Sequence, residues 1–160
     1  MITGIQHISY SVTDVDEARR FFVDVLGLQA TPVRELCGER VEKMFGLPGL
    51  HMKIANIILP DSGNIELAEY VSPQGKEIDL STCNAGLAHL ALTVDDLQQA
   101  YEDLCEKGVH FVHAPLWAKD GALTGWGICH FYGPDGITVE LMEPPRGVEL
   151  DPATGFPLDD

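Results

Sequence analysis

The sequence predicts an α+β protein in which one module of strand, helix and further strands occurs twice. Two similar phrases, GIQHISYSVTDV at residues 4–15 and GLAHLALTVDDL at residues 86–97, open the two halves. A second pair, IELAEYVSP from residue 65 and VELMEPP from residue 139, closes them. Each opening phrase runs from an apolar strand pattern into a helical pattern. A repeat of this length indicates a duplicated module rather than a solenoid unit.

The two pairs of phrases match at two different offsets. His7 and His89 lie 82 residues apart, whereas Glu66 and Glu140 lie 74 residues apart. The offsets differ because the first half carries a longer middle segment. Further pairs that match at these offsets are Gly4 with Gly86, Val12 with Val94, Asp14 with Asp96, Val15 with Leu97, Ala18 with Ala100, Ile65 with Val139, Leu67 with Leu141 and Glu69 with Glu143. Four matched elements in the same order argue against a chance similarity.

One helix is expected in each module, directly after the opening strand. Residues 14–27 place apolar side chains at spacings of three and four, with Asp14 as the N-cap and Gly27 as the stop. Residues 95–108 repeat this pattern, and Gly108 ends it. The apolar faces are formed by Val15, Ala18, Phe22 and Val25 in the first helix and by Leu97, Ala100, Tyr101 and Leu104 in the second.

Further strands are expected at residues 52–59, 127–132 and 137–142. A hairpin turn at 60–63 follows the first of them, and the turn sequence GPDG joins the other two. A short helix is expected at 39–46, whereas residues 114–127, with two tryptophans, and the tail from Pro144 are expected to be irregular. The predicted organisation is a first module over 1–75, a linker over 76–85, a second module over 86–145 and a C-terminal extension over 146–160.

The composition limits the classes of function. The 160 residues include 25 acidic and 10 basic ones, which gives a formal net charge of −15 and a pI near 4.5. This charge repels the phosphates of nucleic acids and the anionic surface of membranes, so we expect a small-molecule partner instead. The four cysteines are scattered, the first residues show no signal-peptide pattern, and no long apolar window could span a membrane. We therefore expect a soluble cytoplasmic protein.

Four side chains on the expected strands are candidates for a metal site. Side chains alternate between the faces of a strand, so these four should point away from the apolar face that packs on the helix. If the sheets of the two halves close around a cavity, two imidazoles and two carboxylates converge there, a ligand set that suits Zn, Mn, Fe, Co or Ni better than Ca. One such histidine alone is more often part of a core, and one such glutamate is more often solvated. The recurrence of both types in both halves favours the metal site, whose candidates are His7, Glu66, His89 and Glu140.

These phrases, with GNIELAEY and GPDGITVELME, resemble the vicinal oxygen chelate superfamily, the group of glyoxalase I, methylmalonyl-CoA epimerase, extradiol dioxygenases and bleomycin resistance proteins. The resemblance covers the chain to about Glu143. It implies two tandem βαβββ modules that form an open barrel-like sheet around a metal cleft. It also implies one divalent metal ion (Zn, Ni, Co, Mn or Fe) whose ligands are His7, Glu66, His89 and Glu140.

The resemblance implies a metal-dependent lyase or isomerase of the glyoxalase or epimerase type. The metal would polarise a carbonyl of the small substrate, and Glu140 or Glu66 would move the adjacent proton. An iron(II)-dependent extradiol dioxygenase is the alternative enzyme, although the position of Glu66 is not a ligand in that group. A drug-sequestering resistance protein is an alternative of another class, although such proteins usually lack these ligands. Members of the superfamily are often dimers, so we expect a homodimer.

Other residues are candidates for shaping a substrate pocket. Arg34, Arg40 and Lys43 offer positive charge for an acidic substrate group, although they also fit a solvated helix face. His130, which lies next to the final hairpin, is a candidate proton relay. Apolar residues that fit either a pocket wall or a core or interface are Met44, Phe45, Leu47, Trp117 and Trp126.

Overall fold

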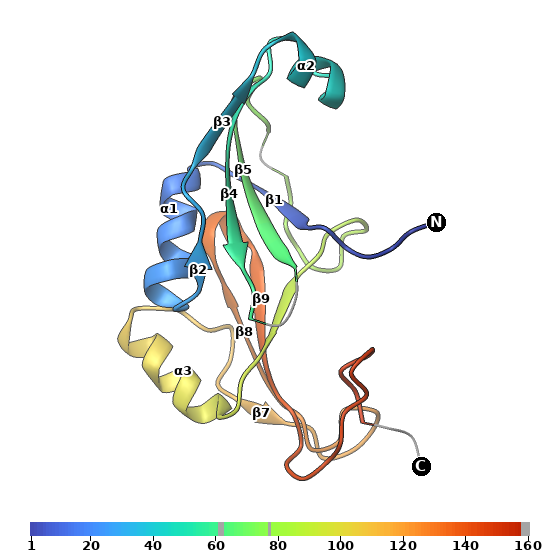
Figure 1. Cartoon of the computed structure of the whole chain (residues 1–160). Coiled ribbons are helices and arrows are strands. Elements are labelled where there is room, and N and C mark those ends of the chain that lie inside the picture. The colour runs from blue at the N-terminus through green and yellow to red at the C-terminus, as the bar shows by residue number, and fades with distance from the viewer. Residues whose placement is uncertain (61–62, 77, 158–160) are drawn as a thin grey trace. The chain divides into compact units, whose positions relative to one another are not determined.

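The structure is a computed structural model that describes residues 1–60, 63–76 and 78–157. The chain divides into two compact units, Met1–Leu87 with Gly133–Ile137 and Ala88–Tyr132 with Thr138–Asp160, and each unit is described by itself. Each unit contains one β-sheet and a helix that packs against it (Figure 1). The expected α+β class with two modules is confirmed. Within the described ranges, no helix is long and apolar enough to cross a membrane.

The first unit contains a five-stranded sheet. Its strands are β1 (Ile8–Val12), β2 (Gln29–Ala30), β3 (Arg34–Cys37), β4 (His51–Ile58) and β5 (Asn64–Ser72). The order is β1-β5-β4-β2, with β3 also paired to β4, and only the β1–β5 pair is parallel. The helices are α1 (Val15–Arg20), the π-helix η1 that continues it (Phe21–Val25), and α2 (Glu39–Phe45).

The second unit contains a four-stranded sheet. Its strands are β6 (Leu90–Thr93), β7 (Leu116–Trp117), β8 (Gly127–Tyr132) and β9 (Thr138–Glu143), in the order β6-β9-β8-β7. The β6–β9 pair is parallel and the others are antiparallel. Helix α3 (Leu97–Glu106) packs on this sheet, and the short 3₁₀ turn η2 (Pro134–Gly136) lies between β8 and β9.

The backbone pairing makes the two modules equivalent residue by residue. Ile8 of β1 lies opposite Ile65 of β5, and Leu90 of β6 lies opposite Val139 of β9. These partners are 82 and 74 residues apart in sequence, the two offsets between the opening and the closing phrases. The first and last strands of both modules are therefore paired in the same register.

Both modules cap their long helix with an aspartate. The Asp14 carboxylate accepts the N–H of Glu17 at 2.8 Å, and the Asp96 carboxylate accepts the N–H of Gln99 at 2.9 Å. Such a side chain satisfies one of the N–H groups that lack an intrahelical partner. The expected N-cap at Asp14 is thus confirmed, and the second module repeats it.

A second carboxylate reaches the start of each helix from the last strand. Glu69 of β5 accepts the N–H of Val15 at 3.1 Å, and Glu143 of β9 accepts the N–H of Leu97 at 2.9 Å. A carboxylate at this end of a helix also interacts favourably with the helix dipole. These two contacts fix which face of each last strand lies against the helix.

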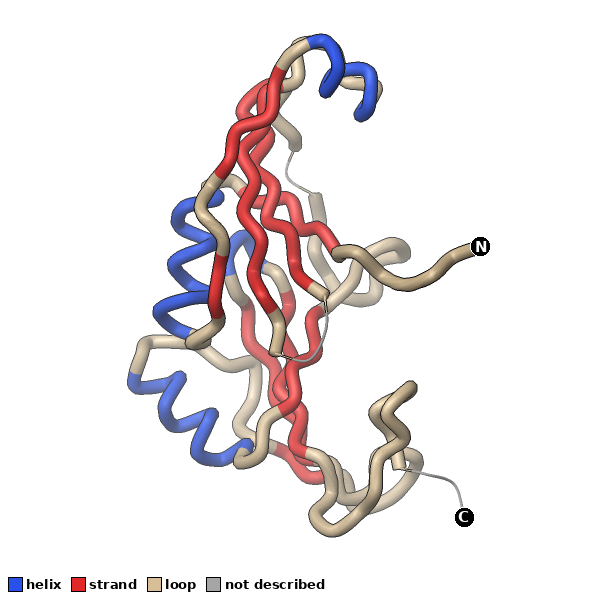
Figure 2. Tube along the Cα trace, viewed as in Figure 1, coloured by secondary structure: helices blue, strands red, loops and turns tan. Residues whose placement is uncertain are grey.

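The core of each unit lies between the sheet and its long helix. Figure 2 shows α1 and α3 beside the strands of their own unit. Apolar helix residues fill this layer together with alternate residues of the last strands. The buried members are Val15, Ala18, Phe22, Ile65 and Leu67 in the first unit and Leu97, Leu104, Val139 and Leu141 in the second.

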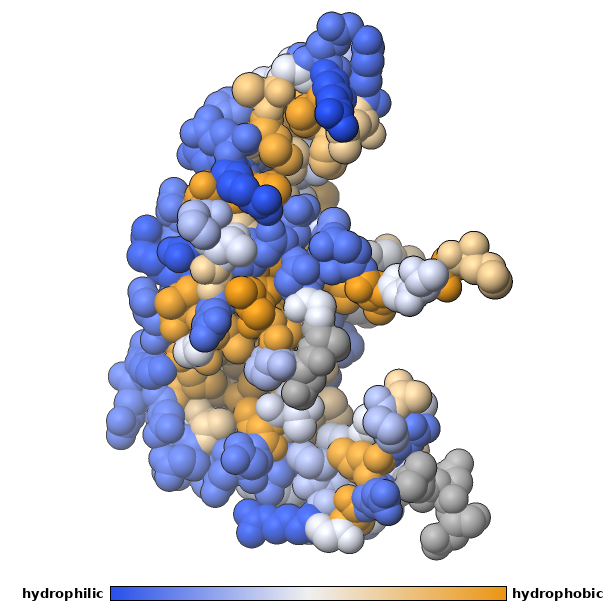
Figure 3. Space-filling view, in the orientation of Figure 1, coloured by the Kyte–Doolittle hydropathy of each residue, from blue (hydrophilic) through white to orange (hydrophobic). Residues whose placement is uncertain are grey.

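Helix α2 and the segment after it cover one end of the first unit's sheet. Buried side chains of β4, β5 and the preceding loop form a small apolar cluster there, which consists of Leu50, Met52, Ile54 and Ala68. Val41 of α2 and Leu47 pack against this cluster. Met44 and Phe45 remain 71% and 44% exposed, and hydrophobic atoms are visible next to charged ones around α2 (Figure 3).

Several features differ from the sequence expectations. The helix expected over 14–27 is α-helical only to Arg20 and then continues as the π-helix η1. The region 114–127 contains strand β7, because Leu116 and Trp117 pair with β8. β1 and β6 are edge strands, so their apolar residues are less buried than expected, and Ile8 is 54% exposed. The expected hairpin turn includes positions 61–62, which lie outside the described residues.

Candidate active site

The strand geometry fixes the direction of both candidate glutamates. Glu69 points toward α1, since its carboxylate accepts a helical N–H. Successive side chains of a strand alternate between the two faces, so Glu66 points away from α1. Glu143 bonds α3 in the same way, and Glu140 therefore points away from α3. The two glutamates occupy equivalent places, each on the sheet face opposite the long helix of its module.

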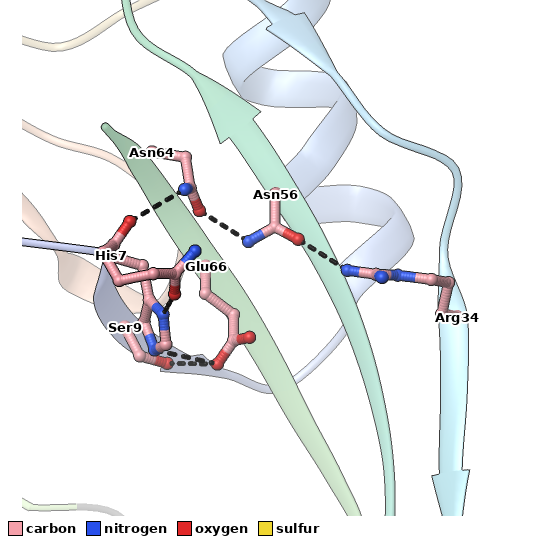
Figure 4. A network of polar contacts seen from close by, with 7 residues as sticks. His7, Ser9, Arg34, Asn56, Asn64 and Glu66 are labelled. Atoms are coloured by element: carbon pink, nitrogen blue, oxygen red, sulfur yellow. Dashed lines mark hydrogen bonds and ion pairs between the residues drawn. The ribbon is translucent and has the colours of Figure 1, made fainter. Parts of the chain in front are cut away.

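The first half-site pairs His7 with Glu66 (Figure 4). Nε2 of His7 lies 3.7 Å from Oε1 of Glu66, and the Ser9 hydroxyl donates to the same oxygen at 3.3 Å. Nδ1 of His7 contacts the side-chain oxygen of Gln6. Because an amide oxygen only accepts, Nδ1 carries the proton, and the neutral ring presents its Nε2 lone pair to Glu66. The side chain of Glu66 is only 17% exposed.

The second half-site places Glu140 between two imidazoles. Nε2 of His89 lies 3.1 Å from Oε2 of Glu140, and Nε2 of His130 lies 3.6 Å from Oε1. The side chain of Glu140 is 12% exposed. His130 is the cross-strand partner of Glu140, as Asn56 is of Glu66. The second module therefore has an imidazole where the first has a neutral amide.

A hydrogen-bonded neighbour sets the tautomer of His130. Nδ1 of His113 lies 2.8 Å from the backbone oxygen of Ala114, which only accepts, so this nitrogen carries a proton. Nε2 of neutral His113 then accepts from Nδ1 of His130 at 3.2 Å, which leaves the His130 lone pair on Nε2, toward Glu140. Burial lowers the pKa of His130, with Glu140 opposing the shift and His113 and His89 adding to it, so the ring is neutral at pH 7.

A chain of side chains extends the first half-site across its sheet (Figure 4). Nη2 of Arg34 donates to Oδ1 of Asn56 at 2.8 Å, and Nδ2 of Asn56 donates to Oδ1 of Asn64 at 2.7 Å. Nδ2 of Asn64 in turn donates to the backbone oxygen of Gln6 at 3.0 Å. The chain fixes both amides on the Glu66 face and connects β3 with the residue that precedes His7.

The chemistry of these donors fits a divalent metal ion. In the first half-site the lone pair of His7 faces a carboxylate oxygen, and in the second the lone pair of His130 does so. Two acceptors that face each other gain no hydrogen bond, and a cation or a proton between them would stabilise both. In the described part of the chain, no three or more His, Cys, Asp or Glu side chains form a group that could hold a metal ion. Each unit instead contributes a pair, and the assignment of the four residues as ligands stays a prediction.

The structure brings the predicted site residues together as two pairs. His7 contacts Glu66 in the first unit, and His89 contacts Glu140 in the second. His130, the candidate proton relay, also contacts Glu140. Both histidines of the pairs lie directly before the first strand of their module rather than inside it.

Sequence reasoning missed three polar neighbours of the half-sites, namely Ser9, Asn56 and His113. The offset of 74 residues matches Asn56 with His130, so the repeat contained a signal for that position. Among the apolar candidates for a pocket wall, Trp126 is 4% exposed and belongs to the core. Trp117, at 45% exposed, remains available at the surface.

Comparison with known proteins gives a family match along most of the chain. Residues 4–141 match the family described as the Glyoxalase/Bleomycin resistance protein/Dioxygenase superfamily. A 2-epi-5-epi-valiolone epimerase from Actinomyces sp is 30% identical over 155 residues, which cover 94% of this chain and 85% of the epimerase. A lactoylglutathione lyase from Arabidopsis thaliana is 26% identical over 146 residues, which cover 91% of this chain and 45% of the lyase.

Solved structures share the fold. A glyoxalase family protein from Bacillus cereus matches with a TM-score of 0.77 and 22% identity, over 91% of this chain and 96% of that protein. A glyoxylase/bleomycin resistance protein/dioxygenase domain from Frankia sp. matches with a TM-score of 0.63 and 23% identity, over 92% and 96% of the two chains. At these identities the similarity shows the common fold.

Proposed function

Because the chain belongs to the Glyoxalase/Bleomycin resistance protein/Dioxygenase superfamily, we propose that it is a divalent-metal-dependent enzyme that moves a proton at the carbon next to a substrate carbonyl. The first candidate reaction is an epimerisation, supported by the 30% identity to 2-epi-5-epi-valiolone epimerase over most of both chains. The second is a lyase reaction of the glyoxalase type, supported by the similarity to lactoylglutathione lyase.

The observation that carries the proposal is the pairing of one imidazole with one carboxylate at the same register of both modules. Side chains that merely fill a core or face solvent have no reason to recur in this way. Glu66 and Glu140 are also largely covered, with side chains 17% and 12% exposed. A carboxylate withdrawn from water is costly unless a proton or cation compensates its charge. A bound cation is the simplest compensation for both modules.

One His–Glu pair from each module would hold this cation, with His7 and Glu66 from the first and His89 and Glu140 from the second. The imidazoles supply neutral nitrogen donors, and the carboxylates balance the charge of a divalent ion. When bound, such an ion acts as a Lewis acid on a carbonyl and makes the neighbouring C–H bond more acidic.

The carboxylates are the groups that take and return the proton. An epimerase must return the proton to the face of the carbon opposite the one from which it was removed, a task suited to two carboxylates from different modules. The Ser9 hydroxyl holds Oε1 of Glu66, which leaves Oε2 for proton transfer. Imidazoles flank both oxygens of Glu140, and their orientation fixes the position of that carboxylate.

Deuterium exchange at the reacting carbon tests the proposal. The metal-loaded protein in D₂O should exchange the C–H next to the carbonyl of 2-epi-5-epi-valiolone or of the glutathione adduct of a 2-oxoaldehyde, as followed by proton NMR. Glu140→Gln keeps the size of the side chain and removes the base, so exchange should fall by about 100-fold or more. Glu149→Gln, at an exposed position of the tail, should leave it unchanged. Exchange at the wild-type rate in Glu140→Gln or in chelator-treated protein would refute the proposal.

A further inference from the structure

Arg34 lies on the same sheet face as the first half-site. It is the cross-strand partner of Ile54, and Ile54 shares a face of β4 with Asn56, which lies opposite Glu66. The hydrogen bond from Arg34 to Asn56, at 2.8 Å, agrees with this placement (Figure 4). The next residue, Glu35, points to the other face, where it contacts His51 at 2.8 Å. The guanidinium of β3 is therefore directed toward the Glu66 face.

Amides rather than a carboxylate hold this guanidinium. In the described part of the chain, no carboxylate oxygen lies within 4 Å of Arg34, although the protein has 25 acidic residues. Other basic side chains do have such a partner, namely Lys43 with Glu39 at 2.6 Å, Lys53 with Glu69 at 3.3 Å and Arg146 with Glu143 at 3.5 Å. Arg34 is thus positioned by a neutral chain and keeps its full charge for another partner.

The second module shows that the fold does not require a cation at this position. Leu116 of β7 lies opposite Ile128, which is equivalent to Ile54 at the offset of 74 residues. Leu116 is therefore the counterpart of Arg34, and it is 61% exposed. The same register holds an exposed leucine in one module and an oriented arginine in the other, so the arginine is a feature of the first half-site.

We propose that Arg34 binds an oxyanion of the substrate, a carboxylate or a phosphate, beside the Glu66 half-site. This inference rests on the proposed function and names the substrate class as an organic anion. A guanidinium has five N–H donors, and Asn56 accepts from Nη2 alone, which leaves donors that match the oxygens of such a group. With a net charge of −15, the chain repels anions, so an anionic substrate needs a local cation of this kind.

The distance between the two groups limits the size of the substrate. Asn56 is the cross-strand neighbour of Glu66, and such Cα atoms lie about 5 Å apart. Arg34 bonds the side chain of Asn56, so its guanidinium lies within roughly 10 Å of the Glu66 carboxylate. The oxyanion of the substrate is therefore only a few bonds from the carbon that loses the proton.

Binding of small probe anions tests the inference without any turnover. Malonate and, in a separate titration, inorganic phosphate are added to the metal-loaded protein, and the Arg34 Nε–H signal is followed by ¹⁵N NMR. Malonamide serves as the uncharged match of malonate. The signal should shift with malonate or with phosphate, whichever anion the site takes, and not with malonamide. Arg34→Gln should weaken that binding by about 10-fold or more, and Arg34→Lys should weaken it less.

Arg20→Gln is the matched control, because Arg20 is an exposed arginine of α1, on the other side of the sheet. This variant should bind the anion as the wild type does. Equal binding of malonate and malonamide, or unchanged anion binding in Arg34→Gln, would overturn the inference even if deuterium exchange is observed. Anion binding that depends on Arg34 in a protein without exchange activity would instead support the inference and refute the proposed reaction.

Discussion

Cys129 of β8 is a thiol that the fold should keep inert. Its side chain is fully buried, and this burial raises its pKa to about 12, with the charges of Cys105 and Glu140 adding to the shift. At pH 8 only about one such thiol in ten thousand is then ionised, and the thiolate is the reactive form. Because its pKa is raised, the folded state favours the protonated thiol, and this contribution to stability is complete below about pH 8.5 and declines as the pH rises toward 12.

A count of reactive thiols with an aromatic disulfide reagent at pH 8 checks this prediction. The three exposed cysteines, Cys37, Cys83 and Cys105, should react in the native protein, and the fourth should react only after unfolding. Cys129→Ser should leave the native count unchanged and lower the count in denaturant by one. Four fast-reacting thiols in the native state would show that β8 is not packed as described.

The sequence could predict those site residues that recur in both modules. His7, Glu66, His89 and Glu140 stand out because two independent offsets relate them. The neighbours that orient them recur less well. Ser9 has Ala91 as its counterpart at the offset of 82, and a methyl group cannot donate to a carboxylate. Partners that are set by one module's own loops, rather than by the shared register, leave no repeat in the sequence.

Both modules join the long helix to the sheet through a glutamate of the last strand, and removal of this contact should be costly. Glu143 is 8% exposed and accepts the N–H of Leu97 at 2.9 Å. Glu143→Ala would leave this buried N–H without a partner, so the free energy of unfolding should fall by about 1–3 kcal/mol. Glu149→Ala, at an exposed position, should change it by less than about 0.5 kcal/mol.

Urea unfolding followed by circular dichroism measures both variants. The midpoint should shift clearly for Glu143→Ala alone, with the slope unchanged. Equal midpoints for the two variants would mean that the carboxylate contributes nothing to the attachment of α3. The sequence matched Glu69 with Glu143 but gave no role to either, because strand alternation alone does not tell which partner a buried carboxylate finds.

Elements with strong periodicity or clear turn residues were predictable, including α2, α3, β4, β8 and β9. The π-helix η1 was not, because apolar spacing hardly distinguishes one widened turn from a regular one. The two-residue strand β7 was not predictable either, since a segment this short becomes a strand only through its pairing with β8.

For the whole molecule, duplication is the central property. The two modules share register, helix caps and the His–Glu pair, yet they differ at Asn56 against His130 and at Arg34 against Leu116. Shared features provide the proposed ligands, and the differences give each half-site its own chemistry. The homodimeric state and the cytoplasmic location expected from the sequence remain predictions.

Metal content tests the central claim, that the two modules together hold one cation. Elemental analysis of protein purified without chelators and reloaded with Zn, Ni, Co or Mn should give one divalent ion per chain. His7→Ala and His89→Ala should each lower the content to near zero, because each removes a ligand of the same ion, whereas His51→Ala, on the other sheet face, should retain it. Two ions per chain, or a full complement of metal in either His7→Ala or His89→Ala, would contradict the account.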